Sequence, residues 1–261
     1  MSGTNNGWNG STCTIGGAGI VPLTDLHAPD DPADFDTTGS LDTTHLHGTG
    51  KHKDQVTGSF LGSKFPVAGK IFSLAFSIGA PSGSAGAPYV NTAMPDDPTL
   101  GFATQMSVSG RKDGRIEGSF TIVRADPSLT GTSVTWAIGD LGFNGSTFSF
   151  AGAPFTGIVS ANYSSSAAAI DTIGAENSDP GTWHVPGIPD ETLTITCLGA
   201  PQCAAKATGA TAMSWNDGGS VGTSSGSYTA ECVSTHPGGS LDGQATTEHV
   251  FKMRRTGSGT S

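Results

Sequence analysis

The chain has 261 residues, a formal net charge of −10 and 39 glycines, and only 13% of its residues are charged. Lys and Arg are too few for a surface built to grip nucleic acid, and no stretch is long and apolar enough to cross a membrane. The first ten residues have neither a basic start nor an apolar core, so no secretory signal is expected. Helix formers are scarce, and short β-branched and aromatic runs between turn signals predict an all-β protein.

The first expected strand follows an Asn-Gly turn signal, the commonest start of a two-residue hairpin. Further strand-like runs follow at intervals, separated by glycine-rich stretches, and residues 80–102 are interpreted as an extended insertion. The runs are NGSTCTIGG from Asn9, FDTTGS from Phe35, DQVTGSFLG from Asp54, IFSLAFSIG from Ile71 and VSGRKDGRIEGSFTI from Val108.

The second half of the chain repeats four of these runs in the same order. Chance plus a shared turn could explain one match, but four ordered matches indicate a tandem duplication. The expected domains are residues 7–126 and 138–255, with a linker at 127–137 and a tail at 256–261. The sequence thus predicts two similar β-sandwich or half-barrel domains, each with at most one short helix; Ala200–Met213 is the one plausible helix. The repeated runs are NGSTFSFAG from Asn144, IDTIGA from Ile170, DETLTITCLG from Asp190 and PGGSLDGQATTEHVF from Pro237.

The four cysteines have no C-x-x-C spacing, which argues against a zinc site. In the repeat alignment Cys13 matches Phe148, and Cys197 matches the region of Phe60. Both are therefore interpreted as small core residues, as Cys203 and Cys232 are, while a disulfide stays open.

The sequence offers no catalytic set. His45, His47 and His52 lie in a Gly-rich stretch, and the second copy has Trp183 and His184 there. An H-x-H pair can bind a metal, but the glycines and prolines favour a solvated or interface loop. The acidic run DDPADFD lacks the order of a calcium loop, and no nucleophile–base set, phosphate loop or basic-aromatic platform is present. We therefore expect no catalytic residue, no metal and no cofactor.

The repeat unit resembles the tail-tube (major tail) proteins of long-tailed bacteriophages. Units of that family open with a short strand after an Asn/Asp-Gly turn, as NGSTCTIGG and NGSTFSFAG do. A second strand ends in an apolar-Asp-Thr step, as FDTTGS and IDTIGA do, and a long loop follows. The resemblance implies that six units close into a ring and that rings stack into a tube. A duplicated chain would supply two units, so three chains would form a pseudo-sixfold ring.

The resemblance also implies a virion protein that is assembled in the bacterial cytoplasm. Its partners would be copies of itself and the tape-measure, tail-terminator and distal-tail proteins. DNA would pass through the lumen without being bound specifically, and no membrane partner is implied. Loops at residues 43–54 and 177–190 would contact the next ring, and an acidic inner wall would let DNA slide. The inter-ring candidates are His45, His47, His52, Trp183 and His184.

Two alternatives stay open. One is another phage tail, ring or capsid decoration protein on the same fold. The other is a carbohydrate-binding or adhesive β-sandwich, which the Trp, Asn and Gly content allows. An enzyme is the least favoured class, because no catalytic set can be assembled.

Overall fold

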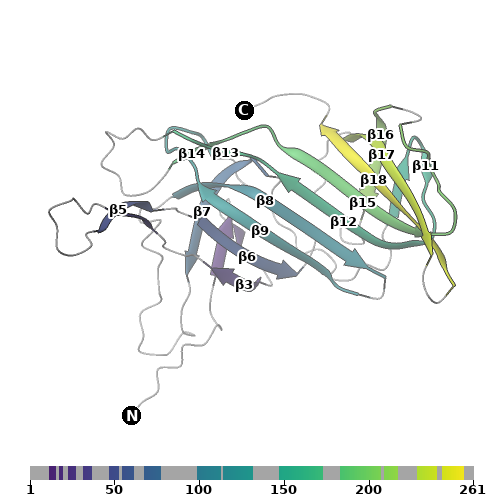
Figure 1. The fold of residues 1–261 in the computed structure, drawn as a ribbon, viewed down its shortest axis with the longest axis horizontal. Helices are drawn as coiled ribbons and strands as arrows, with labels where there is room; N and C mark the ends of the chain where they lie inside the picture. Colours follow the sequence, from purple (N-terminus) through teal and green to yellow (C-terminus); the bar gives the residue numbers. More distant parts are fainter. Residues whose placement is uncertain are drawn as a thin grey trace, which may run out of the picture.

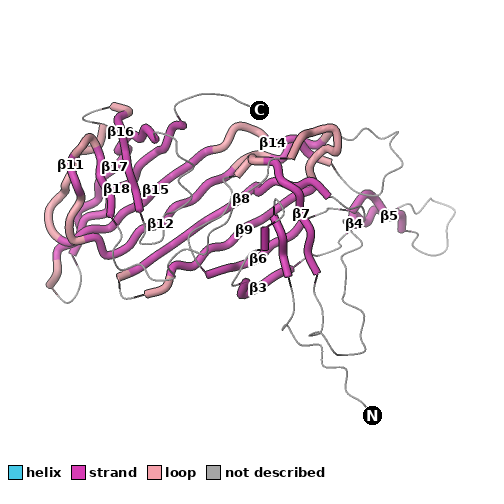
Figure 2. Tube along the Cα trace, turned by 180° about the vertical axis from the view of Figure 1, so that it is seen from behind, coloured by secondary structure: helices cyan, strands magenta, loops and turns pink. Residues whose placement is uncertain are grey.

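The computed structural model forms strands and no helix in the residues it describes, which confirms the all-β class (Figures 1 and 2). Fourteen strands make one antiparallel sheet, and the two hairpins β4–β5 and β13–β14 complete the fold. The described residues are 12–15, 18–19, 23–27, 32–36, 47–52, 55–61, 68–77, 99–112, 114–131, 147–172, 183–206, 209–216, 228–239 and 243–255.

The strands follow the alternation of apolar and polar residues that the sequence shows. In β6, for example, Val56, Gly58 and Phe60 face the core while the residues between them are half-exposed. The first half of the chain forms β1 (Thr12–Ile15), β2 (Ala18–Gly19), β3 (Leu23–His27), β4 (Pro32–Asp36), β5 (His47–His52), β6 (Gln55–Leu61), β7 (Ile71–Ser77), β8 (Thr99–Arg111) and β9 (Ile116–Arg124). The second half forms β10 (Thr147–Phe150), β11 (Ala153–Pro154), β12 (Ile158–Ser166), β13 (Ala169–Asp171), β14 (His184–Pro186), β15 (Asp190–Leu198), β16 (Thr211–Asn216), β17 (Tyr228–Gly239) and β18 (Ala245–Arg255).

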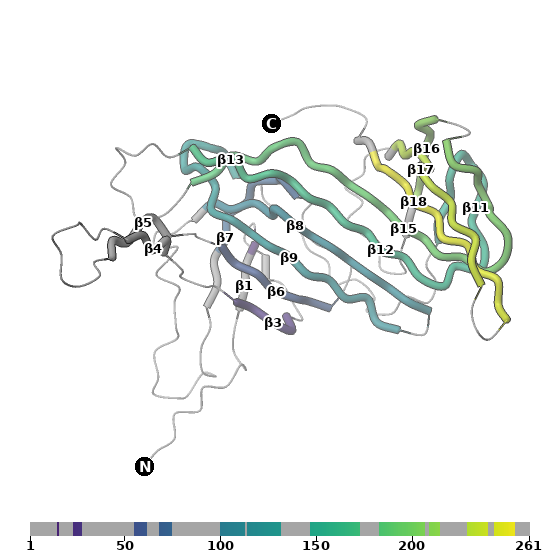
Figure 3. The backbone as a smooth tube through the Cα atoms, in the orientation of Figure 1, coloured from purple at the N-terminus to yellow at the C-terminus, as the bar shows by residue number. Residues whose placement is uncertain are grey.

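Eight of the strands lie side by side in the order β3-β6-β9-β8-β12-β15-β18-β17 (Figures 1 and 3). A smaller set, β7-β1-β2, branches from the first residues of β8, and β16-β10-β11 continues from β17. One face of the eight-stranded sheet is buried, and its apolar side chains form a cluster that includes residues from both halves. The two halves therefore share one sheet and one continuous core.

Strands β1–β9 and β10–β18 correspond one to one. The pairing order is β3-β6-β9-β8-β7-β1-β2 in the first half and β12-β15-β18-β17-β16-β10-β11 in the second. The hairpins match too, because Asp36 pairs with His47 in β4–β5 and Asp171 pairs with His184 in β13–β14. Each half thus has the same topology in the same chain order.

The registers also agree residue by residue. Thr14 pairs with Gly19, and the residues 135 positions later, Ser149 and Pro154, pair with one another. A β-bulge interrupts β3 between Leu23 and Asp25, and the matching bulge interrupts β12. A second bulge in β8, after Ala103, recurs in β17 after Cys232, 129 positions later. Bulges redirect strands and mark specific positions, so their recurrence is a stronger match than strand order alone.

The turn that the two Asn-Gly runs lead into is described in the second copy. Ala151 and Gly152, between β10 and β11, have φ angles of 53° and 78°. Two successive positive φ values are the requirement of a type I′ turn, whose twist matches the flanking strands. The same two-residue spacing separates β1 from β2.

The helix expected over Ala200–Met213 is not formed, and this prediction was wrong. Residues 201–206 are irregular, with a bend at 202–203 and a turn at 205–206, and Thr211–Asn216 is strand β16, paired with β10 and β17. Lys206 and Gly209 have φ angles of 58° and 62°, in the left-handed region that a right-handed helix cannot accommodate. Sheet pairing therefore overrides the weak helix propensity of the alanines.

The loops expected at 43–54 and 177–190 are in part strands. β5 occupies residues 47–52, and β14 and the first residue of β15 lie within the second range. Glycine and proline are compatible with such short hairpins, because Pro32 and Pro186 stand at strand ends, where a missing N–H interrupts no continuous ladder. Each predicted loop therefore carries one arm of a hairpin.

His249 lies fully buried in β18, where the repeat register places Phe120 in β9. The backbone N–H of Gln202 donates to Nε2 of His249 at 3.1 Å, and Nδ1 has no hydrogen-bond partner. Burial lowers the pKa of His249 below its usual value of 6.5, because a charged ring would lose its hydration there.

We expect the free energy of unfolding to fall as the pH drops below 6.5, since the unfolded chain then binds a proton that the folded state resists. His249→Phe should remove this contribution, so its stability relative to wild type should rise from about pH 8 to about pH 5. Urea unfolding at both pH values measures the difference. The reverse change in the first copy, Phe120→His, should add acid sensitivity, and a pH-independent difference for both variants would contradict the assignment.

Candidate assembly interface

One face of the eight-stranded sheet is covered by the core, and the other, here called the polar face, carries mainly exposed or half-exposed side chains. At the end of β9 this second face has a small buried apolar cluster of Phe102, Val123 and Ala125. Hydroxyl groups dominate the polar face, and the Oγ atoms of Ser107 and Ser119 hydrogen-bond across β8 and β9 at 2.8 Å. The described hydroxyl residues of the polar face include Thr57, Ser59, Ser107, Ser109, Ser119, Thr121, Ser160, Ser164, Ser166, Thr192, Thr194, Thr196, Thr229, Ser234 and Thr246.

Acidic residues outnumber basic ones on the described strands of the polar face. Lys252 Nζ lies 2.6 Å from Asp190 Oδ2, and His236 Nδ1 lies 3.5 Å from Glu248 Oε1. Among the side chains that the structure describes, the acids are Asp25, Glu117, Asp190, Glu231 and Glu248, and the bases are Arg111 and Lys252. The described side chains of this face therefore have a negative formal balance.

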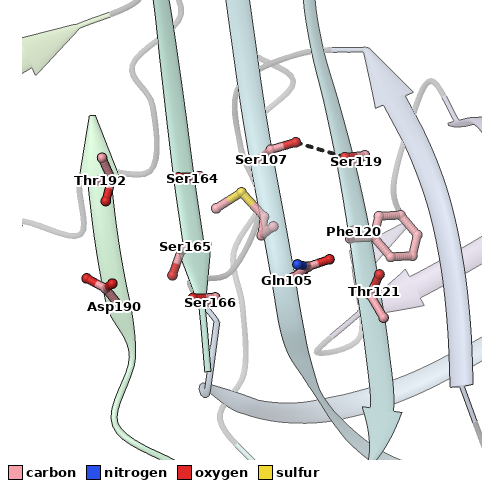
Figure 4. Close-up of a pocket in the computed structure, with 11 residues that line it drawn as sticks. Gln105, Ser107, Ser119, Phe120, Thr121, Ser164, Ser165, Ser166, Asp190 and Thr192 are labelled. Atoms are coloured by element: carbon pink, nitrogen blue, oxygen red, sulfur yellow. Dashed lines mark hydrogen bonds between the residues drawn. The ribbon is translucent and has the colours of Figure 1, made fainter. Parts of the chain in front are cut away.

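A shallow depression of about 430 Å³ lies on the polar face over β9, β8, β12 and β15 (Figure 4). Its lining is mainly serine and threonine, and Asp190 is its one acidic side chain. Phe120 also lines it but is only 3% exposed, so it offers little ring surface. In the part of the chain that the structure describes, no group of three or more His, Cys, Asp or Glu side chains could hold a metal ion. The depression can form hydrogen bonds, but its lining contains no nucleophile–base pair.

The two halves join where β12 pairs with β8. Tyr163 lies opposite Val108 and Asn162 opposite Ser109 in this antiparallel ladder. At the end of the ladder the N–H of Lys112 donates to the carbonyl of Val159 at 2.7 Å. In an antiparallel ladder, hydrogen-bonded pairs of opposite residues alternate with non-hydrogen-bonded pairs. Lys112 and Val159 form a hydrogen-bonded pair, so Asn162 and Ser109, three positions further along, form a non-hydrogen-bonded pair. The junction is thus a regular sheet ladder rather than a flexible linker.

Buried polar contacts reinforce this junction. The N–H of Ala68, from the first half, donates to Oγ of Ser165 in β12 at 3.2 Å. Within the second half, the Tyr163 hydroxyl donates to Glu191 Oε2 at 2.7 Å, which holds the junction strand β12 against β15, and both side chains are buried. Removing one partner of a buried hydrogen bond costs more than the bond itself contributes, so the Ala68–Ser165 contact favours this register of the junction.

The hairpin β13–β14 covers the end of β9. The N–H of Asp126 donates to the carbonyl of His184 at 2.9 Å, and His184 Nδ1 lies 3.3 Å from the carbonyl oxygen of Arg124. The guanidinium carbon of Arg124 lies 5.4 Å from the centre of the Trp183 ring, a cation–π arrangement. A hairpin of the second half therefore binds the strand end of the first.

Asp126 anchors this contact from the other side. Its carboxylate accepts hydrogen bonds from the side chain and backbone of Ser128 at 2.7 and 2.9 Å, and from the Thr172 hydroxyl at 3.0 Å. The two hydrogen bonds from Ser128 hold the pKa of Asp126 below its usual value of 3.8. Asp126 is therefore ionised at neutral pH and connects the end of β9 to β13.

Two strand edges are unpaired in the described residues, at opposite ends of the eight-stranded sheet. The first residues of β8 pair with β7, and its later residues, Gln105–Arg111, pair with β12 on the same edge. In β17 the first residues pair with β16, but no strand pairs with the same edge of Ser234–Gly239. At the far end, β3 pairs only with β6. Inside the chain, an edge of β8 joins an edge of β12. The equivalent edges, on β17 and on β3, are open in the described residues.

The structure gives the sequence-predicted site residues different positions. Trp183 and His184 lie at the junction between the halves, next to Arg124. His47 and His52 begin and end β5, where only the backbone is described, and His45 lies outside the described residues. Their inter-ring role stays a prediction. Sequence reasoning missed Arg124, Asp126 and Ser165, because only the sheet register reveals their partners.

The core interpretation of the described cysteine side chains fits their burial. Cys197 and Cys232 are buried, and Cys203 is half-buried with its Sγ atom 3.1 Å from that of Cys232, without a disulfide. Burial raises the pKa of Cys197 to about 11 and, together with the Cys232 thiol, raises that of Cys203 to about 12. Since the thiolate is the reactive form, Cys197 and Cys203 are not suited to nucleophilic catalysis at neutral pH. The Cys13 side chain lies outside the described atoms.

No protein-family model matches the chain, and a search of curated proteins finds no match. The described residues contain no helix with the length and hydrophobicity needed to span a bilayer.

Proposed function

We propose that this protein is a structural subunit of the tail tube of a long-tailed bacteriophage. Three chains form a pseudo-sixfold ring, and stacked rings form a hollow tube through which DNA passes. One observation carries the proposal: two units with the same topology and register are joined edge to edge, and among the described residues the corresponding edges of β3 and β17 pair with no strand.

The repeated registers and bulges support an origin by tandem duplication, because unrelated domains have no reason to share them residue by residue. The β8–β12 junction is heterologous, since it joins different edges of two equivalent units. Heterologous contacts generate a ring when their rotation closes and a helical filament when it does not. Ring closure also removes exposed strand edges, which otherwise invite uncontrolled pairing.

The polar face is the inner wall of the proposed ring. The opposite face carries the core and the branches β7-β1-β2 and β16-β10-β11, which need the larger outer circumference. Acidic residues outnumber basic ones on the described polar face, and a negative wall repels DNA phosphates rather than retaining them. Hydroxyl groups keep this wall hydrated without adding the positive charges that would bind DNA.

The carbohydrate-binding alternative has less support in the described residues. Sugar sites stack rings on exposed aromatic side chains. Phe120 lines the depression of Figure 4, and Phe60 lines a second depression of about 370 Å³ over β3, β6, β9 and β8, but both rings are almost fully buried. The Trp183 side chain contacts Arg124 at the junction. A related ring protein of the same fold, such as a distal-tail or capsid decoration protein, remains the closer alternative, and its copy number per particle would distinguish it.

Negative-stain electron microscopy of the purified protein over a range of concentrations tests the proposal. We expect rings with sixfold-like end views and hollow, striated cylinders. Isolated globules at every concentration, together with retention on a glycan column, would instead support the carbohydrate-binding class.

A further inference from the structure

We propose that the ring closes through a specific strand ladder, in which Leu26 and His27 at the open edge of β3 in one chain lie antiparallel and opposite Gly239 and Gly238 at the open edge of β17 in the next. The ladder has the register of the internal β12–β8 junction. This inference rests on the proposed function and identifies the contacting residues of a second copy of the chain.

The register follows from the two repeat spacings. β12 follows β3 by 135 residues, and β17 follows β8 by 129, as their pairing partners and bulges show. Asn162 lies opposite Ser109 in the internal ladder. The equivalent residues of the two open edges are His27 and Gly238, and the next pair is Leu26 with Gly239.

The side chains on these edges have the orientation that the ladder requires. His27 and Gly238 are exposed on the polar face, as Asn162 and Ser109 are. Leu26 is buried on the core face, as its equivalent Ala161 is. Joining the two edges therefore continues both faces of the sheet without burying a polar side chain in the core.

Pro237 fits the same register. Its equivalent, Val108, forms a hydrogen-bonded pair with Tyr163 of β12. The backbone nitrogen of Pro237 therefore faces the open edge of β17, and the ladder between β17 and β18 loses no hydrogen bond at this proline. Proline is tolerated in a strand at such positions and discourages indiscriminate edge pairing. The Pro237 carbonyl can still accept a hydrogen bond, so the ladder between chains has one donor fewer than the internal ladder.

The hairpin contact can be repeated as well. β13–β14 binds the backbone of Arg124–Asp126 at the end of β9, and the equivalent of this segment in β18 is Met253–Arg255. The equivalent hairpin, β4–β5, pairs with no other strand in the described residues. Its first strand has the sequence PADFD, whereas β18 ends in two arginines, so the two elements have opposite charge. This complementarity favours a neighbouring chain as the occupant.

Disulfide trapping tests the register. We expect the double variant His27→Cys with Gly238→Cys, oxidised in air with copper phenanthroline, to give covalent trimers on a non-reducing gel. Cross-strand non-hydrogen-bonded pairs have Cβ atoms close enough for a disulfide, and a Cβ at Gly238 meets only Thr246, at 3.9 Å. The bond must form between chains, because β3 and β17 are separated within one chain by seven strand spacings of about 4.8 Å each.

Two matched controls use the same chain. Ser109→Cys with Asn162→Cys tests the equivalent pair inside the chain and should give an internal disulfide without a change of oligomer size. His27→Cys with Gly239→Cys is slipped by one residue, places the thiols on opposite faces and should give no cross-link.

The outcomes separate this inference from the proposed function. Rings in the microscope without a His27→Cys/Gly238→Cys cross-link, while the internal pair is bridged, would overturn the register and leave the tube function standing. Equal cross-linking of the correct and the slipped pair would also overturn it. A protein that stays monomeric at all concentrations would remove the proposed function itself.

Discussion

Replacing Gly118 by threonine is expected to destabilise the protein by about 2–3 kcal/mol through overpacking. A Cβ atom at Gly118 would lie 2.2 Å from Cζ of Phe60, the residue opposite it in β6. The neighbouring pair is equally tight, because a Cβ at Gly58 would lie 2.5 Å from the ring of Phe120. The strands β6 and β9 therefore cannot move apart at one pair without disturbing the other. In the first copy each phenylalanine fills the space above the glycine of the other strand.

The second copy solves the same packing problem with different residues. At the positions of Phe60 and Gly118 it has Cys197 and Thr247, which pair in the same register and are fully buried. We therefore expect Phe60→Cys to relieve the clash that Gly118→Thr creates. Phe60→Cys alone should cost about 3 kcal/mol, since it leaves a cavity.

A double-mutant cycle by urea unfolding measures this compensation. The cost of Gly118→Thr with Phe60→Cys should be smaller than the sum of the single costs by about 2 kcal/mol. Gly118→Thr with Phe72→Cys, at another buried phenylalanine, is the control and should show no such rescue. Additive costs at Phe60 and Gly118 would mean that the two halves do not have equivalent positions there.

The largest loss of stability is expected for Phe251→Ala, about 3–5 kcal/mol. The Phe251 ring is fully buried, and its centre lies 5.0 Å from that of Phe148, 5.1 Å from that of Phe150 and 5.9 Å from that of Phe155. Truncation removes contacts to three aromatic rings at once and leaves a cavity that the surrounding strands cannot close. Both β10 and β18 contribute to this cluster, so the second half as a whole should unfold more readily.

Chemical denaturation checks the effect, with Ile188→Ala as the matched control. Ile188 is 94% exposed, so its truncation should change the free energy of unfolding by less than about 0.5 kcal/mol. A cost below about 1 kcal/mol for Phe251→Ala would contradict the assignment of this aromatic cluster as the core of the second half.

Local patterns predicted the strands well because strand formation depends on short-range alternation. The runs IFSLAFSIG and DETLTITCLG became β7 and β15, and the predicted match of Cys197 with the Phe60 region holds in the strand register. The similarity of the two halves is visible in the sequence because the turns and flanking strands keep similar residue types in the same order. The all-β class followed from composition and alternation together.

The remaining features depend on contacts between residues distant in the sequence. No local pattern indicates that β12 pairs with β8, because either strand would suit several neighbours. The roles of Arg124 and Asp126 depend on a hairpin that begins more than 40 residues later, at Ala169. The Ala-rich segment after Ala200 suggested a helix on propensity alone, and its pairing with β10 outweighs that preference.

Native mass spectrometry of the smallest closed assembly tests the central claim, that each chain supplies two equivalent positions in a ring, most directly. We expect a species with the mass of three 26.2-kDa chains, whose end-on views in the electron microscope show six similar lobes. An assembly of six chains, or a monomer at every concentration tested, would contradict it.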